Sequence, residues 1–286
     1  MKVAAIQMVS ATSLDANLQS ARALLSEAAQ AGAELAVLPE YFCLMGRKDT
    51  DKLAIQEPFS EGPIQKFLSQ TARALNLWIV GGTLPISVDA PSAESSIHEP
   101  PGQGVPDRVY NTSLAFSPSG QCIARYDKMH LFKFDNGSEA FDESRVLLRG
   151  NQPTQFELTD RSGQLWRIGM SVCYDLRFPE LYRHYSQAGA DVLLVPSAFT
   201  HTTGQRHWEV LLRARAIENQ SFVMAPAQGG LHENGRRTWG HSMLIDPWGE
   251  VLAQKPTGAG VVCHDLAFAR RSECHARLPA LSHRLM

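Results

Sequence analysis

The chain has 286 residues, of which 44% are hydrophobic and 20% are charged, and its formal net charge is −2. This composition is typical of a globular protein with a sizeable core, and the small net charge gives no general attraction to nucleic acid or to an anionic membrane. No charged or Ser/Gly-rich linker divides the sequence. We therefore expect a single α/β domain over residues 1–286.

The N-terminal apolar run is short and is broken by Gln7 and Ser10. It therefore lacks both the apolar core of a signal peptide and the roughly 20 apolar residues of a membrane span. The five cysteines are scattered without a C-x-x-C pair, which indicates neither a disulfide framework nor a zinc site. We expect a cytoplasmic protein without membrane association, metal or cofactor.

Apolar runs of strand length alternate with segments of helical period along the chain. The predicted strands are 3–6, 35–38, 78–83, 168–172, 192–195 and 222–225. The predicted helices cover about 14–30, begin at Gly62-Pro63, lie near 179–187 and run from about 205 to 219. This alternation indicates βαβ units with parallel strands.

Two segments, 113–124 and 242–253, resemble each other, because each has Ser or Asp, Pro, any residue and Gly between two apolar runs. This is the residue order of a type I turn, so both are predicted to be hairpins. Each follows a βαβ half, which indicates two related halves with mixed sheets, although two common hairpins can also match by chance. A two-sheet sandwich with helices outside would bury this arrangement.

Two further segments are predicted to lie at the surface. Residues 86–107 are rich in Pro, Ser and Gly and lack periodicity, as expected of a mobile loop. The tail after Asp265 is basic, and we expect it to face solvent or to dock on a partner subunit.

Two charged side chains follow predicted strands, where α/β sheets place their ligand sites. Glu40 comes after 35–38 in an apolar setting that suits a general base. Lys128 precedes the apolar-aromatic run 129–132, so we expect a partly buried ammonium with Glu40 as its counter-charge. A helix-capping Glu and a surface Lys are the alternatives for each residue taken alone.

Cys173 directly follows strand 168–172 and precedes the helix near 179–187. Such an abrupt turn exposes the thiol at the sheet edge and places the backbone N–H of Tyr174 where it can serve an oxyanion hole. We also expect the helix start to lower the pKa of the thiol. Cys173 is therefore the candidate nucleophile.

Three segments resemble the Glu, Lys and Cys motifs of the nitrilase superfamily of carbon–nitrogen hydrolases. They are Leu-Pro-Glu at 38–40, Tyr-Asp-Lys-Met-His-Leu-Phe at 126–132 and Cys-Tyr-Asp-Leu-Arg-Phe-Pro-Glu-Leu at 173–181. Further similarity lies in 196–200, 207–220 and 240–243. Their order and spacing make the resemblance specific, and it covers almost the whole chain.

The resemblance implies a four-layer α-β-β-α sandwich with two mixed sheets, and a homodimer or larger homo-oligomer that extends the sandwich. It also implies a second acidic residue that organises the lysine and the substrate, for which we choose Glu143. The expected catalytic set is Cys173 as nucleophile, Glu40 as general base and Lys128 as the charge-stabilising group.

The expected reaction converts a small carboxylate-bearing amide to acid and ammonia through a thioester. Segments 212–220 and 240–249 look most like the amidases that repair deaminated glutathione. An ω-amidase acting on 2-oxoglutaramate or 2-oxosuccinamate is the alternative. Both kinds of substrate are small anions, so a cationic pocket is expected, with three candidate lining residues: Arg177, Thr202 and Thr203.

Two readings from other classes compete with this one. A papain-like hydrolase would use His207 or His241 as its base and would leave Glu40 and Lys128 idle. A catalytically silent binding module has no support in a chain that retains all three reactive side chains.

Overall fold

The computed structural model describes residues 1–88, 108–137 and 140–285. Its first sheet has eight strands, and the central order is β16-β1-β2-β3-β5-β4, with β6 and β9 also paired to β5. Strands β1, β2 and β3 are parallel, whereas β16 runs antiparallel to β1, and β5 runs antiparallel to β3. The bounds are β1 (Lys2–Gln7), β2 (Leu35–Val37), β3 (Trp78–Val80), β4 (Leu84–Ile86), β5 (Val109–Phe116), β6 (Cys122–Asp127), β9 (Leu147–Leu148) and β16 (Gly260–Asp265).

The second sheet has six strands in the order β10-β11-β12-β13-β14-β15, of which β11, β12 and β13 are parallel. The bounds are β10 (Thr154–Thr159), β11 (Leu165–Met170), β12 (Val192–Leu194), β13 (Phe222–Ala225), β14 (Ser242–Ile245) and β15 (Val251–Lys255). A separate two-stranded ribbon pairs β7 (Lys133–Asp135) with β8 (Ala140–Asp142). The mixed sheets predicted from the two hairpins are thus confirmed.

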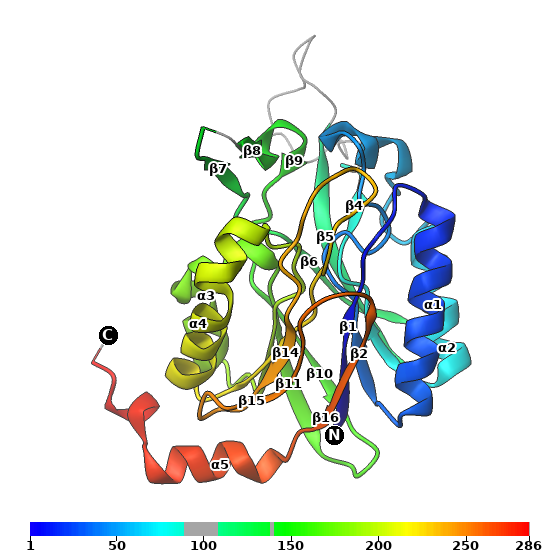
Figure 1. The fold of residues 1–286 in the computed structure, drawn as a ribbon. Helices are drawn as coiled ribbons and strands as arrows, with labels where there is room; N and C mark the ends of the chain where they lie inside the picture. Colours follow the sequence, from blue (N-terminus) through cyan, green and yellow to red (C-terminus); the bar gives the residue numbers. More distant parts are fainter. Residues whose placement is uncertain (89–107, 138–139, 286) are drawn as a thin grey trace, which may run out of the picture.

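The helices form the outer layers, as Figure 1 shows. Helices α1 (Leu14–Gln30) and α2 (Pro63–Leu75) cover the first sheet, and α3 (Pro179–Gln187) and α4 (His201–Asn219) cover the second. One apolar cluster lies between the first sheet and α1 and α2, while another fills the space between the sheets and continues under α3 and α4. This is the predicted α-β-β-α sandwich.

The remaining elements are short or peripheral. They are α5 (Phe268–Arg277) and the 3₁₀ turns η1 (Asp49–Ile55), η2 (Glu143–Arg145), η3 (Cys173–Arg177) and η4 (Ala280–His283). In the basic tail, Arg270 and Arg271 form salt bridges with Asp246 and Asp191 of the same chain, so this part of the tail is tied to its own domain. No helix of the described residues is long and apolar enough to cross a membrane.

The predicted elements match the observed ones closely. Helix α1 has the predicted bounds, and Pro63 is the first residue of α2. Both hairpin turns are present. The N–H groups of Gly120 and Gly249 donate hydrogen bonds to the carbonyl oxygens of Ser117 and Asp246 at 2.8 and 2.9 Å, respectively. Helix α4 begins at His201, four residues before the predicted start. Most of the predicted loop, 89–107, lies outside the described residues.

Candidate active site

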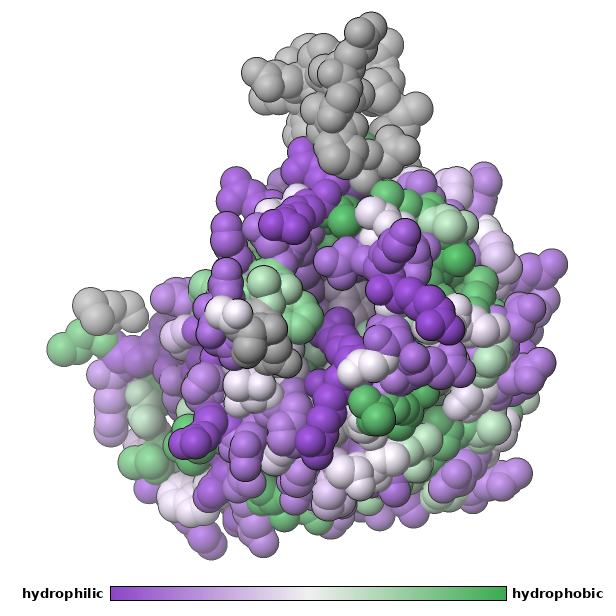
Figure 2. All heavy atoms as spheres, turned by 45° about the horizontal axis from the view of Figure 1, so that its top comes forward, coloured by the Kyte–Doolittle hydropathy of each residue, from purple (hydrophilic) through white to green (hydrophobic). Residues whose placement is uncertain are grey.

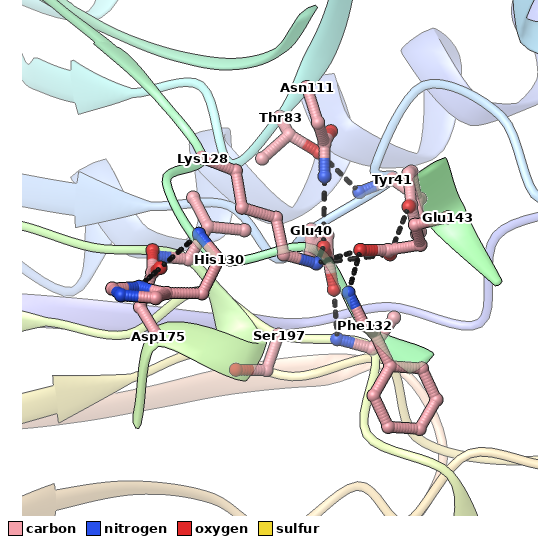
Figure 3. A network of polar contacts seen from close by, with 12 residues as sticks. Glu40, Tyr41, Thr83, Asn111, Lys128, His130, Phe132, Glu143, Asp175 and Ser197 are labelled. Atoms are coloured by element: carbon pink, nitrogen blue, oxygen red, sulfur yellow. Dashed lines mark hydrogen bonds and ion pairs between the residues drawn. The ribbon is translucent and has the colours of Figure 1, made fainter. Parts of the chain in front are cut away.

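Glu40 lies in a turn just after β2 and is almost fully buried. Its Oε1 accepts hydrogen bonds from Lys128 Nζ at 2.8 Å and Asn111 Nδ2 at 2.9 Å, and its Oε2 accepts one from the Ala198 N–H at 2.9 Å (Figure 3). The turn fits tightly against Gly82, where a Cβ atom would lie 2.0 Å from the Pro39 carbonyl oxygen. The carboxylate is therefore held in one orientation by groups from both halves of the chain.

Lys128 follows β6 and is completely buried. Its ammonium group pairs with Glu40 at 2.8 Å and with both oxygens of Glu143 at 2.8 and 3.0 Å. Burial opposes the charge, but the carboxylates of Glu143 and Glu40 outweigh it and raise the pKa of Lys128 above its ordinary value. The ion pair expected between Lys128 and Glu40 is present, and the lysine is a fixed cation.

Glu143 begins η2, and both of its carboxylate oxygens contact the ammonium group of Lys128 (Figure 3). It also accepts hydrogen bonds from the Tyr41 hydroxyl at 2.8 Å and from the Phe132 N–H at 2.7 Å. Burial raises the pKa of Glu143, but Lys128 and the Phe132 N–H outweigh burial and keep its pKa below the ordinary value. The structure thus places the second acidic residue beside the lysine.

Cys173 lies at the elbow between β11 and η3, with a left-handed φ of 50°. A non-glycine residue in this region is strained, and such strain is concentrated at functional sites. The predicted strand-to-helix turn therefore exists. The Tyr174 N–H is at the start of η3, where backbone N–H groups lack an intrahelical acceptor, and among the described residues no other acceptor takes this N–H.

One expectation about this thiol was wrong. Burial and the neighbouring Glu40 carboxylate raise the pKa of Cys173 well above its ordinary value, and Lys128 offsets only part of the increase. The helix start does not lower the pKa, because η3 is a single five-residue 3₁₀ turn and α3 begins only at Pro179. The Cys173 side chain is therefore a protonated thiol, and it lines the same cleft as the Glu40 carboxylate.

A buried carboxylate connects the lysine segment to the turn at Cys173. Asp175 accepts hydrogen bonds from the Tyr126 hydroxyl at 2.7 Å, from His130 N and Nδ1 at 3.0 and 2.7 Å, and from the Val172 N–H at 2.8 Å. Tyr126 and His130 flank Lys128, while Val172 precedes Cys173. Asp175 therefore fixes the distance between the cation and the thiol.

Glu40, Glu143 and Cys173 line a cleft whose empty space, including the part open to solvent, is about 280 Å³. Its lining residues are Glu40, Phe132, Glu143, Cys173, Tyr174, Arg177, Ala198, Phe199, Thr200, Thr203 and Arg236. The end of the molecule with the β7–β8 ribbon is turned forward in Figure 2, and hydrophilic residues predominate there. Neither His207 nor His241 is among the lining residues, so the papain-like arrangement finds no support in the geometry.

The structure separates the three predicted substrate-binding residues. Arg177 and Thr203 line the cleft, whereas Thr202 does not. The Thr203 hydroxyl is 2.8 Å from that of Thr200, the N-cap of α4, so Thr203 also stabilises the helix start. Arg177 lies over the rings of Tyr174 and Phe199, with its guanidinium carbon 5.7 and 5.4 Å from the centroids.

Sequence reasoning missed several residues of the site: Asn111, Asp175, Ala198 and Arg236. Asn111 is within β5, and Ala198 contributes only its backbone N–H. Asp175 belongs to the Cys motif, so its spacing of two residues from Cys173 could have indicated a role. Arg236 lies in the long connection between β13 and β14, where no pattern distinguishes it from its neighbour Arg237.

The sequence matches the carbon-nitrogen hydrolase family over residues 2–276. Deaminated glutathione amidase of Synechocystis sp. (strain PCC 6803 / GT-S) is 40% identical over 284 residues, which cover 99% of this chain and 97% of that protein. Deaminated glutathione amidase of Homo sapiens is 37% identical over 286 residues, which cover 99% of this chain and 81% of that protein. Nit3 of Saccharomyces cerevisiae, a member of branch 10 of the nitrilase superfamily, has a TM-score of 0.82 at 28% identity and covers 100% of this chain and 97% of that one.

The fold, the site and these relatives define one class of enzyme. The chain belongs to the carbon–nitrogen hydrolase family of the nitrilase superfamily. It is an amidase that hydrolyses carbon–nitrogen bonds in linear amides.

Proposed function

We propose that the enzyme hydrolyses its amide through a thioester on Cys173, with Glu40 as general base and Lys128 as the group that stabilises negative charge. The observation that carries this proposal is a protonated thiol and a carboxylate that line one cleft, with a fixed ammonium group 2.8 Å from that carboxylate. Glu40 accepts the thiol proton while Sγ forms a bond to the carbonyl carbon. The carbonyl oxygen becomes an oxyanion, which Lys128 and the Tyr174 N–H stabilise.

Collapse of the tetrahedral intermediate breaks the carbon–nitrogen bond, and the amine leaves with the proton held by Glu40. The same carboxylate then removes a proton from water, whose oxygen attacks the thioester. The carbon–sulfur bond breaks, the acid is released, and the proton returns to Cys173. Glu143 holds Lys128 charged and in place throughout the cycle.

We propose deaminated glutathione as the substrate, on the basis of the relatives named for it. It is an amide between a 2-oxo diacid and the dipeptide Cys-Gly, so the leaving group is the dipeptide amine. The ammonia expected from the sequence would be released only from a primary amide such as 2-oxoglutaramate, the ω-amidase substrate. Both compounds would form the same acyl group on Cys173, and Arg177 is placed to bind a carboxylate in the cleft.

Product release from the two compounds, measured side by side with purified protein, tests the substrate. Dipeptide release with a higher kcat/KM than ammonia release supports the proposal, and the reverse order supports an ω-amidase. Cys173→Ala is the control for both reactions, because it removes only the attacking sulfur atom. Turnover by Cys173→Ala at the wild-type rate would refute the covalent mechanism, whichever substrate is preferred.

We also infer a homodimer or larger homo-oligomer that packs through α4. Val210 and Ile217 lie on one face of this helix with exposures of 68% and 49%, and the turn bearing the half-exposed Trp248 adjoins Ile217. Apolar patches of this kind are typical of interfaces. Val210→Asp is expected to reduce the molecular mass measured by sedimentation.

The five free cysteines suit a reducing compartment such as the cytoplasm.

A further inference from the structure

Two arginines line the cleft, and neither forms a salt bridge within the described part of the chain. Arg177 rests on two aromatic rings and is 3.2 Å from His207 Nδ1. Arg236 donates to the Ala198 carbonyl oxygen at 3.2 Å and lies over the ring of Phe141 at 5.4 Å. Its Nε atom is buried and has no hydrogen-bond partner among residues 1–88, 108–137 and 140–285.

The charge balance shows what these arginines are suited to bind. With both carboxylates ionised, the cluster of Glu40, Glu143 and Lys128 is net negative and would repel an anionic substrate. The positive charges of Arg177 and Arg236 make the net charge of this group of side chains positive. A guanidinium offers planar pairs of donors that match a carboxylate, so each arginine is suited to bind one anionic group.

The two guanidinium groups have different partners, which adjoin only at Ala198 and Phe199. The partners of Arg177 are on η3, on α4 and in the segment before α4, whereas Arg236 contacts Met45, Phe141 and Ala198. Ala198 connects Arg236 to the general base, because its N–H donates to Glu40 Oε2 while its carbonyl oxygen accepts from Arg236. Arg236 therefore lies toward Glu40, from which the departing amine takes its proton.

We propose that Arg236 is a specificity-determining residue that binds a carboxylate on the amine half of the substrate. The cleft would then select amides with an anionic group on each side of the scissile bond. This inference rests on the proposed amidase function and goes beyond it, because it explains how a dipeptide amide is distinguished from a primary amide with the same acyl half.

The first arm of the test changes the substrate. Wild-type enzyme is assayed with deaminated glutathione and with the analogue whose glycine carboxylate is converted to a carboxamide. Loss of a charged hydrogen-bond partner is expected to lower kcat/KM for the analogue by about 10- to 100-fold. Because the enzyme itself is unchanged, this arm does not depend on the folding of a variant.

The second arm changes the arginine. Arg236→Gln is expected to lower the ratio of kcat/KM for deaminated glutathione to that for 2-oxoglutaramate by about the same factor, and Arg236→Lys to restore part of it. Arg236→Gln should also fail to distinguish the acid from its carboxamide analogue. Arg237→Gln is the matched control, because Arg237 is exposed, does not line the cleft and should leave the ratio unchanged.

The outcomes distinguish a failure of the role of Arg236 from a failure of the proposed function. Hydrolysis of deaminated glutathione at equal rates with and without the terminal carboxylate would overturn the role of Arg236 and leave the proposed function standing. An equal loss on both substrates in Arg236→Gln would do the same. If wild-type enzyme hydrolyses neither deaminated glutathione nor 2-oxoglutaramate, the proposed substrate and the inference built on it both fail.

Discussion

Glu40 controls the ionisation of Cys173, and Glu40→Gln makes this control measurable. The substitution keeps the shape of the side chain but removes the negative charge that raises the pKa of the thiol. For two charges about 4 Å apart at an effective dielectric constant of about 20, the interaction is about 4 kcal/mol. Lys128 retains Glu143 as a counter-charge. We therefore expect the pKa of Cys173 to fall while turnover is lost.

The assay follows the rate of alkylation of Cys173 by iodoacetamide as a function of pH, with peptide mass spectrometry to identify the modified cysteine. The expected variant is a poorer hydrolase with a thiol that reacts at lower pH than in the wild type. Glu143→Gln is the matched control, because Glu143 raises the pKa of Cys173 less than Glu40 does. An unchanged or higher alkylation midpoint in Glu40→Gln, or a larger shift in Glu143→Gln, would refute the reasoning.

Three further predictions concern buried titratable side chains. Lys128→Met should lower kcat by at least about 100- to 1,000-fold, whereas Lys133→Met, at an exposed lysine, should have little effect in the same assay. Asp175→Asn should destabilise the protein by about 1–3 kcal/mol in urea unfolding and lower kcat, because the new amide N–H₂ would face hydrogen-bond donors. Unchanged stability and kcat would contradict the positioning role of Asp175. Burial lowers the pKa of His232, which bonds Ser10 O and Thr238 Oγ1. As the pH falls below about 6.5, the His232 side chain therefore takes up a proton in the unfolded state before it does so in the folded state, and the free energy of unfolding should fall until the folded-state pKa is passed. His232→Gln should lack this pH-dependent loss of stability. A rise in stability over the same pH range would contradict the prediction.

The features that sequence could predict depend on local patterns. The apolar periods and the turn residues identified the βαβ units and both hairpins, because burial of one face and turn chemistry act over a few residues. Glu40 and Lys128 could be paired because a lysine flanked by apolar residues needs a counter-charge. Cys173 could be identified because a strand runs directly into a helical segment.

The features that sequence could not predict depend on contacts between distant segments. Helix α4 begins at His201 and includes Gly204 in its first turn. The glycine is required by a distant contact, because a Cβ there would lie 2.3 Å from Trp239 Cβ. The pKa of Cys173 depends on burial and on Glu40, 133 positions away, so the local helix start gave the wrong direction. Arg236 reaches the cleft through the pairing of its loop, including the Trp239 N–H to the Phe199 carbonyl oxygen at 2.9 Å.

The central claim is that amide hydrolysis proceeds through an acyl group on Cys173. Acid-quenched mixtures of enzyme with deaminated glutathione, and separately with 2-oxoglutaramate, can be digested and examined by mass spectrometry. We expect the same acyl adduct from both compounds on the peptide that contains Cys173, and no adduct in Cys173→Ala. Full turnover without any adduct on Cys173, or an adduct on a different residue that is kinetically competent, would contradict it.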